Sequence, residues 1–405
     1  MRLRARRASI ALLLLAPLLI GGTDAVAGTE DGPVSIERSA QAIPGQYIVS
    51  LNPDHAPDGV LRRLGVKAMF TYDSALHGFA ARLSPTQLAA ARSLPAVRAI
   101  EENAKINLVQ PVGSAKAGAQ LPNHRPRRSM VPAASWGLDR IDQRNLPLDG
   151  QFDAVATGSG VTAYIVDTGI ETAHEEFEGR ASVGFDAIGD GQDGQDCAGH
   201  GTHVAGTVGG ATYGVAPDVS LVAVRVLGCE GGGTLAGVIA GFDWVAENAR
   251  HPAVLNASLG GGSSPALDEA VNEVAARGVL PVVAAGNEAQ DACRVSPARA
   301  ADVFTVGATN SSDQQARFSN YGTCLEAYAP GVDIISAQLG GGYVALNGTS
   351  MASPHVAGVA ALLKENYPAA APEDVSLWLT DNATEDVISP ISAASPNRLL
   401  HTGGL

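Results

Sequence analysis

Apolar runs alternate with helical patterns from about Trp136 onward, and this alternation constrains the fold more than any other feature. Runs of apolar residues that end in turn residues cover five segments: 161–166, 221–227, 253–257, 279–285 and 303–307. Between them, 235–248 places its large apolar residues on one helical face, and 266–277 ends at Gly278, a suitable C-terminal cap. Continuous apolar strands alternating with helices indicate a mostly parallel sheet covered on both faces, a three-layer α/β domain over residues 133–402.

A smaller module precedes this domain at residues 44–108. Its segment 46–51 is predicted to be a strand, and Pro85 falls in the first turn of a predicted helix. Such a mixture of strands and helices predicts a small α+β domain with one sheet, helices on one face and a thin core. Residues 28–43 are expected to be a disordered lead-in. Residues 109–132 show no periodic pattern of apolar residues and are predicted to be a linker.

The N-terminus has the pattern of a secretory signal peptide. Four arginines precede an apolar run from Ile10 to Ile20, and Ala25–Ala27 offers a small-residue cleavage site, so residues 1–27 are predicted to be removed on export. A retained anchor is the alternative, but the run is short for a membrane span. We expect an exported, extracellular product with no membrane attachment after signal removal.

Charge is distributed unevenly along the chain. Residues 1–128 hold 16 basic and 9 acidic residues, whereas the remainder holds 11 basic and 32 acidic residues. An acidic body argues against nucleic acid as its partner.

Four cysteines lie in residues 129–405, the acidic part of the chain. Export favours disulfides, but four cysteines allow three pairings that the sequence does not distinguish.

Three segments place reactive side chains at points where strands end or helices begin. Asp167 ends the apolar run 161–166, at the edge of the sheet where α/β proteins bind ligands, although an Asp there can also be a turn or helix cap. His200 is flanked by glycines at a helix start. His203, one turn later, raises the possibility of zinc, but no third ligand or nearby Glu is evident, so we expect His203 to be a packed structural residue.

The third segment is centred on Ser350. It begins a predicted helix in which Pro354 is tolerated only in the first turn. Serine at a helix start is commonly a cap. A nucleophile there would instead gain from the positive end of the helix dipole, which stabilises developing negative charge.

Together the three segments resemble the subtilisin-like serine proteases. The resemblance rests on Asp-Thr-Gly at 167–169, His-Gly-Thr-His-Val-Ala-Gly at 200–206 and Gly-Thr-Ser-Met-Ala-Ser-Pro-His-Val-Ala-Gly at 348–358, in the family's chain order. Trp136–Gln143 is similar to the start of mature members of the proteinase K and aqualysin branch, and 44–108 resembles the family's inhibitor-type propeptide. The resemblance implies a secreted, monomeric serine endopeptidase with Asp167, His200 and Ser350 as its triad. Its partners would be polypeptide substrates and its own propeptide, which acts as inhibitor and folding aid.

The resemblance also implies roles for further residues. Asn287 would donate to the oxyanion, together with the Ser350 backbone N–H. Two glycine-rich segments would flank the substrate backbone and leave side-chain selectivity broad: Gly231, Gly232 and Gly233, and Ser258, Leu259 and Gly260. The cysteine spacing resembles that of aqualysin-like members and implies the bridges Cys197–Cys229 and Cys293–Cys324.

Structural calcium is a further implication. Asp139, Asp142, Gln143 and Asp149 match an N-terminal calcium site of the branch, although Gln151 departs from the expected Asn. A second site would use Glu326 with the carbonyl oxygens of Ala301 and Val303, but the branch usually has Asp where Glu326 stands. These acids could equally be part of a solvated acidic surface. No cofactor is expected for catalysis.

Two other functions remain open at this point. One is a processing protease specific for basic residues, against which the Gly- and Ala-rich pocket segments speak. The other is a catalytically inactive binding protein on the same fold, against which the intact triad speaks. Maturation could begin by self-cleavage near the end of the module, around Asn107, or involve trimming at Arg125–Arg128, which could also be an ordinary solvated run.

Overall fold

The computed structural model describes residues 32–109, 111–113, 116–117 and 131–405, and Pro33–Leu405 form one compact unit. The predicted signal peptide, 1–27, and the basic cluster Arg125–Arg128 lie outside the described residues. Within the described ranges, no helix is both long and apolar enough to cross a membrane.

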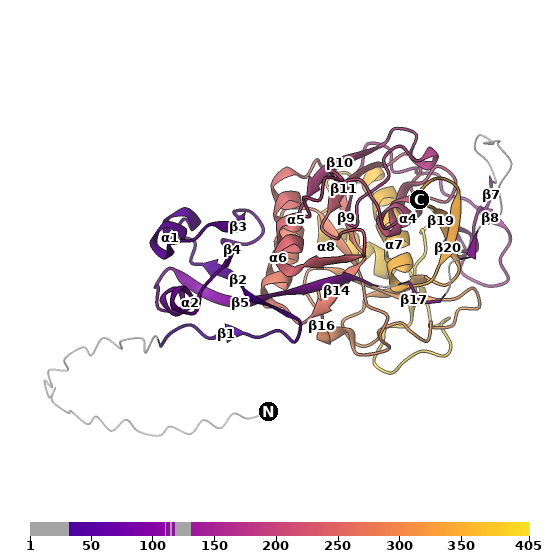
Figure 1. Ribbon diagram of the computed structural model, residues 1–405. Helices are drawn as coiled ribbons and strands as arrows, with labels where there is room; N and C mark the ends of the chain where they lie inside the picture. Colours follow the sequence, from indigo (N-terminus) through magenta and orange to yellow (C-terminus); the bar gives the residue numbers. More distant parts are fainter. Residues whose placement is uncertain (1–31, 110, 114–115, 118–130) are drawn as a thin grey trace, which may run out of the picture. The chain divides into compact units, whose positions relative to one another are not determined.

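The C-terminal region is built on a central sheet with helices beside it (Figure 1). Among the described residues this sheet has nine strands, in the order β10-β11-β9-β13-β15-β17-β18-β22-β21. All neighbours pair in parallel except the last two, which are antiparallel. In chain order the strands are β9 (Thr162–Asp167), β10 (Ala181–Asp186), β11 (Ser220–Arg225), β13 (Ala253–Ala257), β15 (Leu280–Ala284), β17 (Phe304–Thr309), β18 (Ala327–Pro330), β21 (Thr384–Glu385) and β22 (Arg398–Leu399). The five predicted strands are thus confirmed as β9, β11, β13, β15 and β17.

Helices cover both faces of this sheet and make the fold a three-layer α/β structure. The helices are α3 (Trp136–Asp142), α4 (His200–Gly209), α5 (Leu235–Asn248), α6 (Pro265–Ala276), α7 (Thr349–Asn366) and α8 (Pro372–Asp381). Successive residues of β9 point to opposite layers, as strand geometry requires. Ala163 and Ile165 pack in the core formed with α4 and α7, whereas Tyr164 and Val166 pack in the core formed with α5 and α6.

The N-terminal module is a small α+β domain, as predicted. Its elements are β1 (Ile36–Glu37), β2 (Ala42–Leu51), α1 (Pro57–Leu64), β3 (Ala68–Tyr72), β4 (Gly78–Arg82), α2 (Pro85–Arg92) and β5 (Val97–Leu108). The helices α1 and α2 share a core with one face of the sheet, while the other face packs into the core around α5 and α6. The expected disordered lead-in is wrong for its described part, because β1 pairs with β5 and β2 begins before Pro44.

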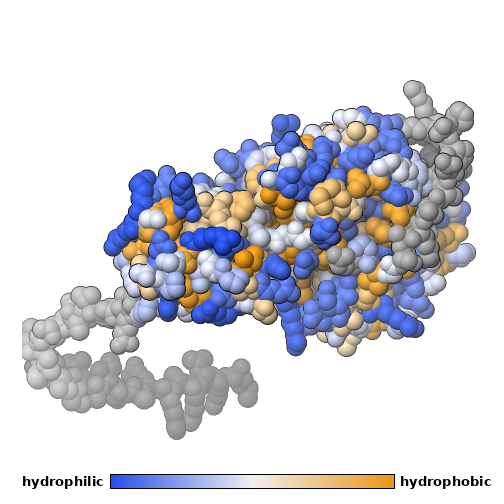
Figure 2. Space-filling view, in the orientation of Figure 1, coloured by the Kyte–Doolittle hydropathy of each residue, from blue (hydrophilic) through white to orange (hydrophobic). Residues whose placement is uncertain are grey.

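Shorter elements complete the described chain. They are β6 (Lys116–Ala117), β7 (Val131–Pro132), β8 (Gln151–Phe152), β12 (Gly232–Thr234), β14 (Leu259–Gly262), β16 (Val295–Ser296), β19 (Ile334–Ala337), β20 (Tyr343–Leu346) and two 3₁₀ turns at Glu175–Phe177 and Ala292–Arg294. On the face shown in Figure 2, hydrophilic residues break the hydrophobic surface into separate patches. The exposed large hydrophobic residues come from separate segments, as in Met69, Val155 and Tyr367.

Candidate active site

The first two candidate residues meet where a strand ends and a helix begins. Asp167 is the last residue of β9, and His200 is the first residue of α4. The imidazole Nδ1 of His200 lies 2.8 Å from Asp167 Oδ1, and both side chains are buried. Gly199 leads into the helix with a φ of +90°, a left-handed conformation that glycine adopts without steric cost.

The two histidines of α4 have opposite electrostatic surroundings. Burial alone would lower the pKa of His200, but the charge and hydrogen bond of Asp167, with the charge of Asp196, outweigh burial and raise the pKa of His200. Burial, with the charge of His200, lowers the pKa of His203 to about 3. Nε2 of His203 donates toward the carbonyl oxygens of Ile334 and Val344, both at 3.1 Å. His203 is therefore a packed structural residue, as predicted.

Asp196 holds the loop that leads to His200, a role that the sequence analysis missed. Its Oδ1 accepts from the Thr168 hydroxyl at 2.9 Å and from the N–H groups of Ala198 and Gly199 at 2.8 and 2.9 Å. Its Oδ2 accepts from the N–H and hydroxyl of Thr202 at 2.9 and 2.7 Å. A carboxylate four residues before His200 was the available signal, since Asp commonly caps the first turn of a helix.

Ser350 lies in the first turn of α7, and its side chain is turned toward the N-terminal module. The Ser350 hydroxyl donates to the carbonyl oxygen of Val109 at 2.9 Å and lies 3.4 Å from the carbonyl oxygen of Ser258. Nε2 of His200 is buried without a hydrogen-bond partner among the described residues. In this structure, therefore, the hydroxyl donates to the carbonyl oxygen of Val109 and makes no hydrogen bond with the imidazole of His200.

The position of Pro354 differs from the prediction. It lies inside α7 beyond the first turn, where it cannot donate to the carbonyl of Ser350 four residues earlier. The hydroxyl of Ser258 replaces the missing donor, at 3.0 Å from the Ser350 carbonyl oxygen. A substitute donor makes the interior proline tolerable, and it also anchors the backbone of Ser350.

Asn287 lies beside the same helix start. Its Oδ1 accepts from both the N–H and the hydroxyl of Thr349 at 2.9 Å, which fixes the orientation of the amide. Its Nδ2 lies 3.1 Å from the position that a Cβ on Gly348 would take. The structure thus brings the amide next to the loop that precedes Ser350.

The strand β5 of the module lies between the two predicted substrate segments and pairs with both. Gly232 and Gly233 pair with Asn107 and Ile106, and Leu259 and Gly260 pair with Leu108 and Asn107, all antiparallel. Two further hydrogen bonds extend the strand. The N–H of Leu108 donates to Gly231 O at 2.9 Å, and that of Val109 donates to Ser258 O at 3.3 Å.

Two glycines of this groove lie close to neighbouring atoms, Gly233 to a backbone oxygen and Gly261 to a side chain of β5. A Cβ on Gly233 would meet Val226 O at 2.3 Å, and one on Gly261 would meet Ile106 Cδ1 at 2.5 Å. All six predicted substrate-binding residues therefore lie against residues 106–109, the end of β5 and the residue after it. The predicted linker does not begin at once after the module, because Val109 is itself buried in this groove.

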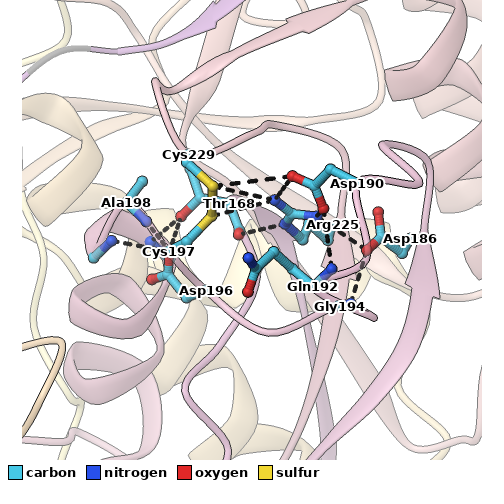
Figure 3. Close-up of a disulfide and its surroundings, with 12 residues drawn as sticks. Thr168, Asp186, Asp190, Gln192, Gly194, Asp196, Cys197, Ala198, Arg225 and Cys229 are labelled. Carbon is cyan, nitrogen blue, oxygen red and sulfur yellow. Dashed lines mark hydrogen bonds and ion pairs between the residues drawn. A yellow bond between two sulfur atoms is a disulfide. The ribbon is translucent and has the colours of Figure 1, made fainter.

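The structure contains both disulfides that the resemblance implies. Cys197 is bonded to Cys229 with a Cα–Cα distance of 4.8 Å, and Cys293 is bonded to Cys324 with one of 5.4 Å. The first bridge lies three residues before His200 and beside a buried arginine, Arg225 (Figure 3), which the sequence analysis did not single out.

Two of the predicted calcium-binding acids have features that suit a cation. Asp139 Oδ1 and Asp142 Oδ1 are buried without a hydrogen-bond partner among the described residues. Burial first, and then the charges of Asp139, Asp149 and Asp153, raise the pKa of Asp142 from 3.8 to about 6, against a hydrogen bond from the Asp153 N–H. Carboxylate oxygens without a hydrogen-bond partner are hard oxygen donors of the kind that calcium binds. Gln143 Oε1 accepts from the Asp149 N–H at 3.1 Å, so these two residues lie in the same cluster.

Glu326 has different surroundings. Its Oε2 accepts from the N–H of Thr305 at 2.5 Å, and burial raises the pKa of Glu326 to about 7. It borders a cavity of about 1110 Å³ that Ala301 and Val303 also line. The buried oxygens that lack partners in the described chain include none from Glu326.

Comparison with known proteins agrees with this geometry. The subtilase family (Peptidase S8) matches residues 158–402, and peptidase inhibitor I9 matches residues 60–108. The chain is 45% identical over 403 residues to an extracellular serine proteinase of Thermus sp. (strain Rt41A), covering 93% of this chain and 94% of that protein. It is 49% identical over 331 residues to alkaline serine exoprotease A of Vibrio alginolyticus, covering 82% of this chain and 59% of that protein.

A solved structure supports the same assignment. A cold-adapted subtilisin-like serine proteinase matches with a TM-score of 0.66 and 52% identity, covering 67% of this chain and 98% of that one. The family match spans more than half of the chain, and the first relative is matched over nearly its whole length. The chain therefore belongs to the subtilase family and is a serine endopeptidase that carries an inhibitor I9 propeptide ahead of its peptidase domain.

Proposed function

We propose that this chain is the precursor of a secreted, monomeric endopeptidase of broad specificity that uses Asp167, His200 and Ser350 as a catalytic triad. The observation that carries the proposal is the position of Val109. Its N–H donates to Ser258 O, and its carbonyl oxygen lies 2.9 Å from Ser350 Oγ. A backbone held on both sides, with a carbonyl at the serine hydroxyl, is the arrangement of a protease with a bound substrate strand.

The roles follow from this arrangement. Ser350 Oγ attacks the carbonyl carbon, His200 accepts the hydroxyl proton and passes it to the leaving amine, and Asp167 orients His200 and stabilises its charged form. The raised pKa of His200 fits a base that must hold the proton transiently. The side-chain amide of Asn287 and the N–H of Ser350 would stabilise the oxyanion.

Broad specificity rests on how the strand is held. Most of the contacts to 107–109 are backbone hydrogen bonds to Gly231, Gly232, Ser258, Leu259 and Gly260, which do not depend on the side chain of the bound residue. The residue whose carbonyl meets Ser350 is an apolar valine, which speaks against strict selection for basic residues.

The precursor's first substrate would be itself. We expect the attacked bond to be the one that follows Val109, two residues beyond the site near Asn107 that the sequence suggested. After this cut, residues up to Val109 would remain in the groove as the inhibitor. Residues 44–108 and 133–402 would then be the propeptide and mature domains, with later trimming in 109–132.

Structural calcium is part of the proposal. Asp139 and Asp142, whose Oδ1 atoms lack partners within the described part of the chain, would bind the ion with Gln143 and Asp149. Bound calcium would offset the repulsion between these carboxylates and stabilise the mature enzyme by mass action. Glu326 is the weaker candidate, since one of its oxygens is already held by the Thr305 N–H.

Incubation of the purified protein with casein, with and without a serine-reactive inhibitor, tests the function. We expect inhibitor-sensitive cleavage at many different residues, lost in Ser350→Ala. Cuts confined to dibasic sites would favour the processing protease, and no cleavage would favour the inactive binding protein.

A further inference from the structure

Building on the triad proposed above, we propose that Arg225 is a positioning residue, which holds the carbonyl group of Thr168, the residue after Asp167, and so aligns Asp167 with His200. Arg225 is the last residue of β11 and pairs directly with Asp167, the last residue of β9. Its side chain is fully buried, at 0% exposure. A buried guanidinium one strand away from the catalytic carboxylate calls for an explanation, because unpaired buried charge is costly.

Every N–H group of Arg225 has an acceptor nearby (Figure 3). Nε donates to the carbonyl oxygen of Thr168 at 3.1 Å. Nη1 donates to Asp186 Oδ2 at 3.1 Å and Asp190 Oδ1 at 2.7 Å, and Nη2 donates to Asp190 Oδ2 at 2.8 Å and Cys197 Sγ at 3.3 Å. Five donors with five acceptors hold the planar group in one orientation.

Through its hydrogen bonds, Thr168 connects Arg225 to both proposed catalytic residues, Asp167 and His200. Its N–H donates to Asp167 Oδ1 at 2.7 Å, the same oxygen that lies 2.8 Å from His200 Nδ1. Its hydroxyl accepts from the N–H of Gly201 at 2.9 Å and donates to Asp196 Oδ1. A shift of the Thr168 residue, backbone and hydroxyl together, would therefore move the carboxylate and the start of α4 at once.

The disulfide beside Arg225 joins the same assembly to the substrate groove. Cys197 lies three residues before His200, and Cys229 lies three residues before Gly232, the first residue of β12.

Arg225 also supplies the positive charge that offsets the negative charges of Asp186 and Asp190. Its hydrogen bond lowers the pKa of Asp190 to about 2, so Asp190 stays ionised at working pH.

Lysine cannot replace this residue, because an ammonium offers three donors and no planar fork. We expect Arg225→Lys to lower kcat by about ten- to a hundredfold, the effect of a small misplacement of catalytic groups, with little change in KM. The matched control is Arg140→Lys, with calcium present. Arg140 is also fully buried and binds Asp313 through Nε at 2.7 Å, outside the proposed catalytic residues. We expect this control to lose thermal stability while keeping kcat.

The pH dependence of kcat/KM distinguishes a positioning role of Arg225 from a contribution to stability alone. The charged or titratable groups that act on His200 are Asp167 on β9, Asp196 in the loop before α4 and His203 in α4. Asp167 raises the pKa of His200, so a looser Asp167–His200 contact lowers that pKa. The acidic limb of kcat/KM in Arg225→Lys should therefore move to lower pH, while that of Arg140→Lys should stay in place.

A wild-type kcat and an unmoved acidic limb in Arg225→Lys would overturn the proposal, whatever its melting temperature. If Arg225→Lys yields no mature enzyme, Asp190→Asn decides the question. The side chain of Asp190 is 33% exposed, so its loss should be tolerated, and we expect a smaller fall in kcat in the same direction. Unchanged kcat in Asp190→Asn would then refute the positioning role of Arg225.

Ser350→Ala, assayed in parallel, tests the triad separately. Full activity in that variant would refute the proposed function and not the Arg225 argument.

Discussion

Asp243 offers a direct test of how the propeptide is held on the peptidase domain. This nearly buried residue of α5 accepts three backbone N–H groups of the propeptide. Its Oδ1 accepts from Ser74 at 2.8 Å and Ala75 at 2.6 Å, and its Oδ2 accepts from Asp73 at 3.3 Å. Asp243→Asn keeps one acceptor oxygen but removes the charge and replaces the other acceptor with a donor.

The size of the effect follows from hydrogen-bond energetics. Bonds to a charged acceptor contribute about 1.5–3 kcal/mol, and neutral ones about 0.5–1.5 kcal/mol. The substitution should therefore weaken the complex by about 1–3 kcal/mol, which is about a 5- to 150-fold faster release of the propeptide. The mature enzyme should keep its kcat, because Asp243 lies outside the proposed catalytic machinery.

The assay uses the precursor after self-cleavage. The complex is isolated by gel filtration and diluted into peptide substrate, and the lag before activity appears gives the release rate. Glu269→Gln is the matched control. It breaks an ion pair with Arg98 in which the two side chains are 42% and 44% exposed, so it should cost less than about 1 kcal/mol. Equal lags for Asp243→Asn and wild type, or a larger effect of Glu269→Gln, would refute the reasoning.

Three further predictions address the active site and the metal. Asn287→Ala should lower kcat by about 10²–10³-fold with little change in KM, and a rise in KM alone would contradict its oxyanion role. The acidic limb of kcat/KM should lie above pH 6.5, since the pKa of His200 is raised and the neutral imidazole is the base; Asp167→Asn should move that limb to lower pH as well as reduce kcat. Excess chelator should speed thermal inactivation of the mature enzyme relative to millimolar calcium; Asp142→Ala should remove most of this difference, and equal rates in the two wild-type buffers would sink the calcium proposal.

The sequence predicted most of the fold because strong periodic patterns decide it. The parallel strands of the central sheet are short continuous apolar runs, and α5 and α6 have clear apolar faces. The strands β10, β18 and β22 were not predicted, since they lack long, continuously apolar runs and depend on pairing with neighbours distant in the sequence. The early start of the module was missed for the same reason, because β1 depends on pairing with β5.

In the candidate site, too, some residues could be predicted from the sequence and others could not. The residues expected to react with substrate lie in distinctive sequence motifs, whereas the residues that hold them in position do not. Ser258 was expected only to bind substrate, yet its hydroxyl also holds the carbonyl that Pro354 leaves without a donor. Asp196 and Arg225 act through backbone groups brought near by folding, and a buried arginine cannot be told from an exposed one in the sequence.

The central claim is that the proposed triad cuts its own chain first at the bond after Val109. The most direct measurement is intact mass and N-terminal sequencing of the purified wild-type precursor and of Ser350→Ala, both made without other proteases and sampled over time. We predict that the first wild-type fragment ends at Val109 and that Ser350→Ala stays whole. A first cut at another bond would contradict the placement of Val109, and normal processing of Ser350→Ala would contradict the triad itself.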